Sequence, residues 1–337
     1  MNNTLFVTQK RSDAIGIVDN AIKNELSYLK HNFDFLELYE KEKDKLKIIY
    51  NYFRSTCKLL WIARKYDQLY FSWENPFVIF VNFFYPKKHI IMTVHHVEDY
   101  RWKSKIWKLI LNAVDKFIAI SKFTKKQLIE LWVKSENVTV NYNGISWEFY
   151  PEPIQHFQKF PYILYIGTES PRKNTNTLLE VFAMLNKKYP NTKLVKIGKP
   201  WEKQAQLLFD QKVKELNIKD SIIINREFVS TDNLRKWYSN ALCYVSLSIL
   251  EGFWLTIPEA MACGCPVVVS DIGPFREICE DSQILVDPMN KNAILAGIEK
   301  YINDESFKKN KIQEGIEKAR RFNWKDNAKR LIQAIWF

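Results

Sequence analysis

Two glutamates eight positions apart, Glu251 and Glu259, bracket the stretch EGFWLTIPE. The strand-like run CYVSLS precedes them, and a helix-like segment begins at Thr256. Free loop amides at a helix N-terminus attract phosphate, and a nearby carboxylate accepts hydrogen bonds from ribose or sugar hydroxyls. This pattern favours a site that grips a nucleotide-sugar at both ends. The alternative is structural, because Thr256 and Glu259 also match a helix capping box.

A second candidate site lies in the stretch YILYIGTESPRKN, residues 162–174. The strand-like run ends at Gly167, so Arg172 and Lys173 fall in the loop that follows it. A forked guanidinium beside a point-charge ammonium suits a diphosphate. The alternative interpretation is a solvated basic loop that is capped by Asn174.

Two histidines, His95 and His96, follow the strand-like run HIIMTV at residues 89–94. Ligands of open parallel sheets bind beyond the carboxyl ends of strands, which favours a binding role for this pair. No third His or Cys is suitably spaced nearby for zinc, and the chain has no Asp-x-Asp pair to hold Mg²⁺. We therefore expect no bound metal.

The elements that must position these residues alternate between short apolar runs and segments of helical period. Such alternation indicates an α/β protein with parallel sheets covered on both faces, and two sets of strands indicate two doubly wound, Rossmann-like domains. The expected strands are TLFVT (4–8), FDFLELY (33–39), QLYFSW (68–73), HIIMTV (89–94), KFIAIS (116–121), VTVNYN (138–143), YILYIG (162–167), TKLVKIG (192–198), SIIINREF (221–228), CYVSLS (243–248), PVVVS (266–270) and ILVD (284–287).

Prolines and glycines mark the joints between these elements. The segment 147–161 holds three prolines and no clear period, so it is the linker candidate between the two domains. Glycine is scarce, with nine residues in the chain. Several of them fall at or just after the end of a strand-like run, where a ligand crevice is expected: Gly144, Gly167, Gly198, Gly252 and Gly273.

Composition bounds the class of protein. With 337 residues, 47% of them hydrophobic, the chain is long enough for two globular domains. No apolar run reaches the roughly 18 residues of a membrane-spanning helix, and the N-terminus lacks a signal-peptide pattern. Five cysteines without framework spacing indicate a reducing compartment. We interpret Cys263 and Cys265 as small core residues rather than a redox pair.

The net charge of +12 includes a local excess, because residues 101–126 carry eight basic residues and one acidic residue. One interpretation is an ordinary helix with solvated lysines and an apolar face in the core. The other is a membrane-surface patch in which Trp102 and Trp107 lie at the interface and the lysines meet anionic head groups. A basic chain also raises the alternative of a nucleic-acid-binding protein, although no nucleic-acid motif supports it.

Taken together, these stretches resemble the retaining glycosyltransferases of family 4, which have the GT-B fold. EGFWLTIPEAMACGCPVV matches the family's Glu-x7-Glu signature, and YIGTESPRKN matches its Pro-Arg-Lys-Asn loop, typical of a mannosyl- or glucosyltransferase-like subgroup. TVHH, KFIAISKFTKKQL, NYNGI and ARRFNWKDNAKRLI match lesser signatures. The similarity runs from about residue 90 to the end of the chain and is strongest in the C-terminal half.

The resemblance implies roles for the matching positions. Glu259 would bind the donor ribose and Glu251 would contact the transferred sugar. Arg172 and Lys173 would neutralise the diphosphate, and His95 would hydrogen-bond the donor sugar. Together with Arg172, Lys173 and Glu259, the donor-binding positions would be Gly16 near an N-terminal glycine loop, Gly167, Thr168, Gly252, Phe253, Trp254 and Leu255.

The resemblance also implies an organisation and a mechanism. Residues 1–155 would form the acceptor domain, 156–318 the donor domain across a cleft, and 319–337 a helix that crosses back to the first domain. A hexose would pass from a UDP- or GDP-sugar to a glycan or lipid-linked acceptor, with retention and without a metal or other cofactor. Stabilisation of the departing diphosphate would supply most of the catalysis. The protein would be cytoplasmic, with an anionic membrane surface as a candidate partner through residues 101–126.

Departures from the family pattern leave alternatives open. The family usually has Gly where Trp254 stands, which leaves the geometry of this loop and of the sugar pocket open. The family's usual glycine is also missing from INREFVS, which leaves open which base the donor carries. Three alternatives follow: a degenerate transferase that only binds, a GT-B epimerase or phosphorylase, and a non-catalytic nucleic-acid-binding protein. Nucleic acid is not the partner that we expect, because that function leaves both glutamates unexplained.

Overall fold

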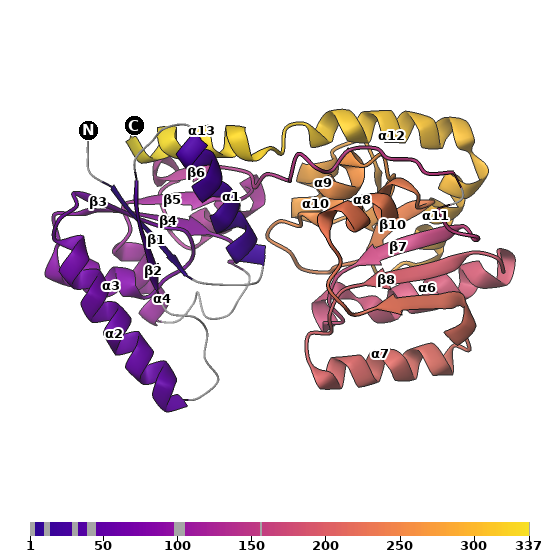
Figure 1. Cartoon of the computed structure of the whole chain (residues 1–337), viewed down its shortest axis with the longest axis horizontal. Coiled ribbons are helices and arrows are strands. Elements are labelled where there is room, and N and C mark those ends of the chain that lie inside the picture. Colours follow the sequence, from indigo (N-terminus) through magenta and orange to yellow (C-terminus); the bar gives the residue numbers. More distant parts are fainter. Residues whose placement is uncertain are drawn as a thin grey trace. The chain divides into compact units, whose positions relative to one another are not determined.

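The computed structural model describes residues 4–9, 14–28, 33–38, 45–97, 105–155 and 157–336. The chain divides into two compact units, which are treated separately (Figure 1). The first unit comprises residues 1–144 and 323–337, and the second comprises residues 145–322.

The first unit is built on a six-stranded parallel sheet with the order β2-β1-β3-β4-β5-β6. Its strands are β1 (Thr4–Gln9), β2 (Asp34–Leu38), β3 (Gln68–Phe71), β4 (His89–Val94), β5 (Lys116–Ala119) and β6 (Val138–Val140). Its helices are α1 (Ala14–Tyr28), α2 (Lys45–Ala63), α3 (Phe77–Phe84), α4 (Lys105–Asn112), α5 (Lys122–Glu130) and α13 (Trp324–Trp336), with a 3-10 turn at Ser135–Asn137.

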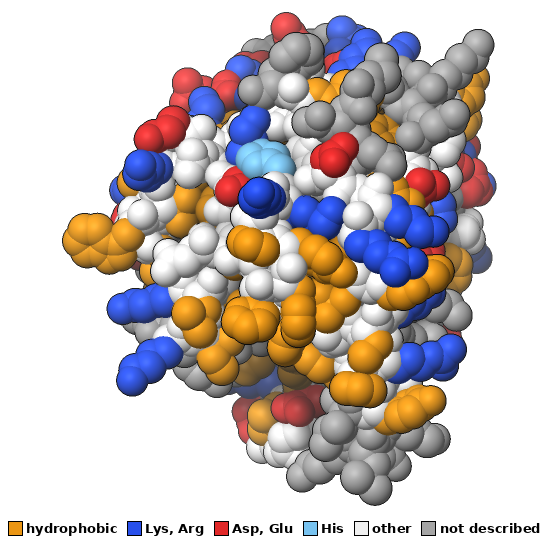
Figure 2. Space-filling model, turned by 90° about the vertical axis from the view of Figure 1, so that its left-hand side faces the viewer, with side chains coloured by type: hydrophobic (Ala, Val, Ile, Leu, Met, Phe, Trp, Pro, Cys, Tyr) orange, Lys and Arg blue, Asp and Glu red, His pale blue; other side chains and the backbone are white. Residues whose placement is uncertain are grey.

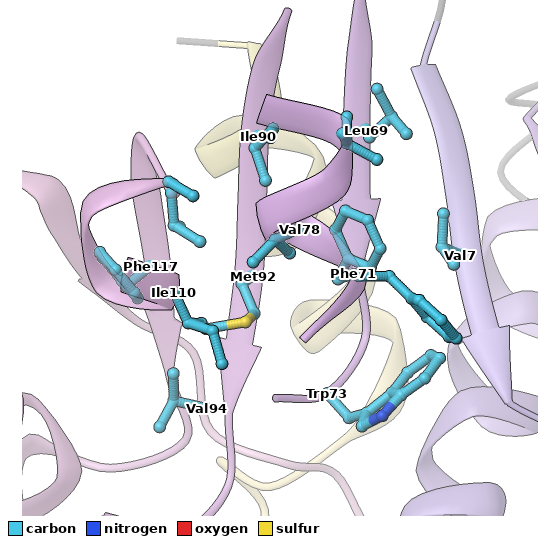
Figure 3. Packing of buried hydrophobic residues seen from close by; sticks show 14 of the residues in the cluster. Val7, Leu69, Phe71, Trp73, Val78, Ile90, Met92, Val94, Ile110 and Phe117 are labelled. Carbon is cyan, nitrogen blue, oxygen red and sulfur yellow. The ribbon is translucent and has the colours of Figure 1, made fainter. Parts of the chain in front are cut away.

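Both faces of this sheet are buried, because its strands are apolar on both sides. The register aligns Val7, Phe71, Met92 and Phe117 in one row across four strands. That row belongs to the core formed with α2, α3, α4 and α5, and Figure 3 shows Phe71 and Met92 facing the two helices that carry Val78 and Ile110. The next residue of each strand points to the opposite face, so Phe6, Tyr70 and Ile91 pack against α1 and α13 instead.

The second unit has a six-stranded parallel sheet with the order β12-β11-β10-β7-β8-β9. Its strands are β7 (Tyr162–Ile166), β8 (Lys193–Ile197), β9 (Ile222–Asn225), β10 (Cys243–Ser246), β11 (Val267–Ser270) and β12 (Ile284–Val286). Its helices are α6 (Thr175–Lys188), α7 (Lys203–Glu215), α8 (Thr231–Ser239), α9 (Thr256–Ala262), α10 (Gly273–Cys279), α11 (Lys291–Asn303) and α12 (Glu305–Ala319), with 3-10 turns at Pro171–Lys173 and Lys219–Ser221.

The order of strands places a topological switch point in each unit. The chain moves outward from β7 through β8 to β9 and then returns to the other side of β7 with β10. The loops after β7 and β10 therefore diverge above the sheet, which is where ligands of doubly wound folds bind. In the first unit the equivalent point lies between β1 and β3.

All twelve expected strands are present, and the prediction of two doubly wound α/β domains is confirmed. The compact units change after Gly144 and after Phe322, whereas the sequence places the boundaries after residues 155 and 318. The first difference has a clear cause. The segment after Ile145 is held by the second unit, because Arg235 of α8 pairs with Glu152 at 2.7 Å and donates to the Glu148 carbonyl at 3.2 Å.

Cys263 and Cys265 are buried and free, which agrees with their interpretation as core residues. Within the residues that the structure describes, no helix is both long enough and apolar enough to cross a membrane.

Gly144 lies against the backbone at the start of α13. A Cβ atom at this position would lie 2.4 Å from the Trp324 nitrogen and 2.6 Å from the Asn323 carbonyl carbon. Both are backbone atoms, so Gly144→Ala forces the start of α13 to shift. We expect the variant to lose about 1–3 kcal/mol of unfolding free energy, measured by denaturant or thermal unfolding.

Gly297→Ala in α11 is the matched control. Its added methyl would meet the Ile284 and Val268 side chains at 3.1 and 3.4 Å, and side-chain ends can give way. Alanine also favours a helix interior by up to about 1 kcal/mol. Equal stability of Gly144→Ala and the wild type, or an equal loss in both variants, would contradict the close approach at Gly144.

Candidate functional site

The loops that follow β7 and β10 meet directly at the switch point of the second unit. The Ile249 amide donates to the Arg172 carbonyl at 2.9 Å, and the Arg172 guanidinium donates to the Leu250 carbonyl at 3.2 Å. Asn174, at φ 51°, ends the 3-10 turn in the left-handed region and lets α6 begin at Thr175. Its side chain forms no helix cap, so the capping role considered for it is wrong.

Glu251 is the centre of this meeting point. Its carboxylate is 1% exposed and lies 2.6 Å from Arg172 Nη1 and 2.5 Å from Lys173 Nζ. Lys173 is equally buried, whereas 37% of the Arg172 side chain is exposed. A buried charge is costly unless it is paired, so the three groups depend on one another. The two predicted cations and the first predicted glutamate are thus one cluster.

Lys173 is held in an unusual environment. Burial lowers the pKa of Lys173 to about 7, while the neighbouring Glu251 carboxylate raises it and Arg172 lowers it. The ammonium also lies over the ring of Trp254, 2.7 Å from its centroid. An indole face attracts a cation and excludes water from it. The charge of Lys173 at neutral pH therefore depends on the anion beside it.

Next to Lys173, the side chains of Trp254, Tyr244 and Tyr238 contact one another in a row, here called the aromatic wall. Trp254 Nε1 donates to the Tyr244 hydroxyl at 3.2 Å, and that hydroxyl lies 2.7 Å from the Thr256 hydroxyl. A Cβ at Gly167 would lie 2.7 Å from the Tyr165 hydroxyl and 3.5 Å from the Trp254 ring. Glycine at position 167 therefore keeps the β7 loop close to the wall.

Glu259 joins this wall from α9. Its carboxylate accepts a hydrogen bond from the Tyr238 hydroxyl at 3.1 Å, and the Tyr238 and Tyr244 rings lie edge to face at 5.8 Å. Burial raises the pKa of Glu259 to about 7, against a smaller lowering by the Tyr238 hydrogen bond. Leu255 precedes α9 and no side chain caps the helix, so the capping-box interpretation of Thr256 and Glu259 is wrong.

Among the described residues, no Lys or Arg forms an ion pair with Glu259. A desolvated carboxylate without a counter-cation gains most from neutral donors, because hydroxyl groups can satisfy its oxygens without adding charge. This is the chemistry of a group that accepts hydrogen bonds from a diol.

A further buried ion cluster was not anticipated from the sequence. Glu169, in the β7 loop, lies 2.7 Å from Lys196 of β8 and 3.0 Å from Arg226 after β9, and Arg226 also pairs with Asp210 of α7 at 2.6 Å. Glu169 and Lys196 are fully buried, and burial lowers the pKa of Lys196. The cluster fastens the β7 loop to the two neighbouring strands. Each partner comes from a different element, so no local spacing signals it.

A cavity of about 240 Å³ lies next to this cluster. It is lined by Glu169, Pro171 and Asn174 of the β7 loop region and by Glu202 and Leu208 at α7. The cavity therefore borders the loop that carries Arg172 and Lys173.

His95 belongs to the first unit, directly after β4. It is 3% exposed, and its Nε2 lies 3.0 Å from the Ser72 carbonyl after β3. Glu74 accepts hydrogen bonds from the backbone amides of both His95 and His96, so it organises this loop. Ser72 in turn donates to the buried Asp19 of α1 at 3.0 Å. Sequence reasoning missed Glu74 and Asp19, although Glu74 follows a predicted strand.

The remaining predicted positions divide between the two units. Gly16 lies within α1, so it is not part of a loop. Thr168 accepts a hydrogen bond at its carbonyl from the Tyr165 hydroxyl at 2.8 Å. The Phe253 ring packs on Phe322 at 5.6 Å, which leaves its backbone as the part available to a ligand. Gly252, Trp254 and Leu255 complete the β10 loop.

In the part of the chain that the structure describes, no three His, Cys, Asp or Glu side chains form a group that could hold a metal ion. A metal-free reaction stays a prediction.

Comparisons with known families cover both units. The family model described as Glycosyl transferases group 1 matches residues 147–334, and the one described as Glycosyltransferase Family 4 matches residues 34–149. The first match includes all the second-unit residues of the site.

Individual relatives are more distant. The O-antigen chain mannosyltransferase B of Escherichia coli is 28% identical over 257 residues, which are 71% of this chain and 65% of the relative. The N-acetylgalactosamine-N,N'-diacetylbacillosaminyl-diphospho-undecaprenol 4-alpha-N-acetylgalactosaminyltransferase of Campylobacter jejuni is 27% identical over 154 residues, or 45% of this chain and 40% of the relative. The chain thus spans less than two thirds of the length of these relatives.

Solved structures share the fold. The Anabaena protein HepE, in complex with UDP and glucose, superimposes with a TM-score of 0.80 at 16% identity, and the match covers 99% of both chains. The expected GT-B fold, with its two Rossmann-like domains, is therefore confirmed.

The raised pKa of Glu259 predicts a pH-dependent stability. The folded protein takes up a proton that the unfolded chain, with a pKa near 4.5, releases, so this group's contribution to stability is present below pH 4.5 and is lost as pH rises toward 7. Between pH 4.5 and 7, we expect the unfolding free energy of Glu259→Gln to fall by about 2–3 kcal/mol less than that of the wild type. Unfolding free energies of variant and wild type, compared across this range, measure the difference.

Glu227→Gln is the control, because Glu227 is an exposed carboxylate of the same unit. Its unfolding free energy is expected to follow the wild type at each pH. If Glu259→Gln also followed the wild type, the carboxylate would be ionised as freely as an exposed one, and its assigned environment would be wrong.

Proposed function

The chain belongs to the Glycosyl transferases group 1 family, and from this premise we propose that it transfers a hexose from a nucleotide-sugar to a glycan or lipid-linked acceptor. The observation that carries the proposal is the buried cluster of Arg172, Lys173 and Glu251 at the switch point of the second unit. Two cations held against the carboxyl end of the sheet are suited to bind the diphosphate of such a donor.

In this proposal the cations stabilise the departing diphosphate. Arg172 is the accessible cation and can fork onto two phosphate oxygens, whereas Lys173 supplies a desolvated point charge. Charge that is already fixed in place costs little reorganisation as the leaving group develops its own. The proposed reaction uses no metal, because these cations supply the positive charge, and it proceeds with retention of configuration, as the resemblance to the retaining family implies. The second unit acts as the donor domain and the first unit as the acceptor domain.

The donor's other groups are assigned by the chemistry of the site. Glu259 accepts hydrogen bonds from the ribose hydroxyls, since it is a partly buried carboxylate that pairs with no Lys or Arg among the described residues. Glu251 contacts the transferred sugar, and the backbone amides of the β10 loop, around Phe253 to Leu255, meet the sugar or the phosphates. Gly167 and Thr168 allow the donor to approach β7 closely.

In the first unit, His95 hydrogen-bonds the donor sugar. Gly16 lies in α1, which follows the carboxyl end of β1 in the chain. We assign Gly16 to the donor site on this position alone.

Relatives support the substrate classes. The Escherichia coli relative is named as a mannosyltransferase of the O-antigen chain, which supports a hexose donor and a glycan acceptor. The Campylobacter relative is named for a diphospho-undecaprenol acceptor, which supports an acceptor linked to a lipid. HepE was solved with UDP, which supports a uridine nucleotide, while GDP-sugars remain part of the proposal.

A binding-only protein is the second candidate function. It is favoured by Trp254, whose ring covers Lys173 where a diphosphate would need to bind. Such a protein would be stabilised by a nucleotide without transferring or hydrolysing a sugar. Assay of released nucleotide in the presence of donor and acceptor separates the two candidates.

Thermal unfolding with UDP-, GDP- and ADP-sugars, with and without EDTA, tests the donor site. A ligand at about 100 times its dissociation constant adds about 2.7 kcal/mol to stability. We expect one nucleotide-sugar to stabilise the wild type regardless of EDTA and to stabilise Glu259→Ala and Glu259→Gln much less.

Glu317→Ala in α12 serves as the matched control, because Glu317 is an exposed carboxylate outside the loops of the site, and it is expected to respond like the wild type. A shift that EDTA abolishes would contradict the metal-free reaction. The absence of any shift in the wild type would contradict the donor site itself.

A further inference from the structure

α3 is apolar on every side and yet is only half covered. Its sequence FVIFVNFF has one polar residue, Asn82, and Phe77, Val78 and Val81 fill the core beneath it. The opposite side is exposed: Phe80 by 38%, Phe83 by 77% and Phe84 by 56%. A helix that is hydrophobic all round normally has both sides buried, whereas no part of the chain that the structure describes covers the outer side of this one.

The neighbouring helix α2 continues the same feature. Leu59 and Ala63 point into the core, whereas Tyr50, Phe53 and Trp61 are exposed by 63%, 69% and 56%. These three lie three to eleven residues apart at helical spacing, so they form one outward stripe. These exposed aromatic side chains add little to the core, because α2 is anchored there by Leu59 and Ala63 on its inner side.

α4 extends the feature on the other side of α3. Ile106 and Leu109 are exposed by 60% and 56%, while Ile110 is buried. α3 contacts both α2 and α4, so the three helices form one continuous surface, here called the aromatic face. Figure 2 shows hydrophobic side chains gathered on this side of the molecule with Lys and Arg side chains around them.

The charges on and around the aromatic face are mostly positive. Residues 50–94 and 105–116 together contain nine Lys or Arg and three Asp or Glu. Arg64 and Lys65 both lie over the Trp61 ring, 5.0 Å from its centroid, and Lys105 and Lys108 flank Ile106. Trp107 packs partly buried against the core, so its place at a membrane interface stays a prediction, and Trp102 lies outside the described residues.

We propose that the aromatic face inserts into the surface of an anionic lipid bilayer. Its Phe, Trp and Tyr side chains fit the boundary between acyl chains and head groups, and its lysines and arginines complement anionic head groups. The choice of a bilayer rests partly on the proposed lipid-linked acceptor, whose reacting end lies at such a surface. The contact uses α2 and α3 in addition to the basic segment 105–126.

Sedimentation with lipid vesicles tests this surface with the full chain. The vesicles contain either phosphatidylcholine alone or phosphatidylcholine with about 30% phosphatidylglycerol, at about 0.15 M salt. The wild type is expected to bind the anionic vesicles more strongly. Phe83→Ser with Phe84→Ser is expected to lower the partition coefficient at least about tenfold, and Trp61→Ser is expected to lower it less.

Trp147→Ser with Leu207→Ser is the matched control, because these side chains of the second unit are exposed by 86% and 53%. It is expected to bind like the wild type, with thermal unfolding to show that each variant is folded. The vesicles hold no acceptor and no donor, so failure of the proposed transfer reaction leaves this result unchanged. Failure of vesicle binding likewise leaves the nucleotide-induced thermal shift unchanged.

The proposal is overturned if the wild type does not bind anionic vesicles, or if the Phe83 and Phe84 variant binds as well as the wild type. Light scattering, which measures the oligomeric state, tests whether a second copy of the chain binds the aromatic face instead. A wild-type dimer that becomes monomeric in the same variant would assign the aromatic face to a second copy of the chain and would overturn the membrane proposal.

Discussion

The candidate site depends on one buried carboxylate. Glu251 lies in the loop after β10 and forms ion pairs with both Arg172 and Lys173 in the loop after β7, so a single ion cluster joins the two loops that diverge at the switch point. Without Glu251, Lys173 would be a buried ammonium facing an indole ring and a guanidinium. Removing one partner from such a cluster leaves an uncompensated charge, which typically costs about 3–5 kcal/mol.

The surroundings of this cluster explain its sensitivity. Trp254 excludes water from Lys173, and its hydrogen bond to Tyr244 connects it to the aromatic ring of Tyr238, which donates to Glu259. Both ionisable ends of this wall have a pKa near 7, and burial is the main cause in each case. A diphosphate bound at Lys173 and a diol bound at Glu259 would therefore change the protonation of these two side chains.

Sequence reasoning predicted the strands well because each one is a short apolar run bounded by polar or turn residues. It also found Arg172, Lys173 and Glu251, since they follow strands whose carboxyl ends meet. It missed the buried ion pairs of Glu169 with Lys196 and Arg226, which join three separate elements. Glu259 was open to two interpretations because Thr-x-x-Glu spacing is the same whether the glutamate caps a helix or binds a ligand, and its hydrogen bond from Tyr238 was not predicted. The outer stripes of α2 and α3 were not predicted, because exposure is decided by what the fold leaves uncovered.

The central claim is that Glu251 and Lys173 act as one unit in binding the donor. A double-mutant cycle of Glu251→Gln and Lys173→Met, read out as the dissociation constant of the nucleotide-sugar that stabilises the protein, measures this coupling directly. The account predicts an interaction free energy of at least about 1 kcal/mol, because the second substitution removes little once the first has broken the cluster. Additive losses, equal to the sum of the single variants within about 0.3–0.5 kcal/mol, would contradict it.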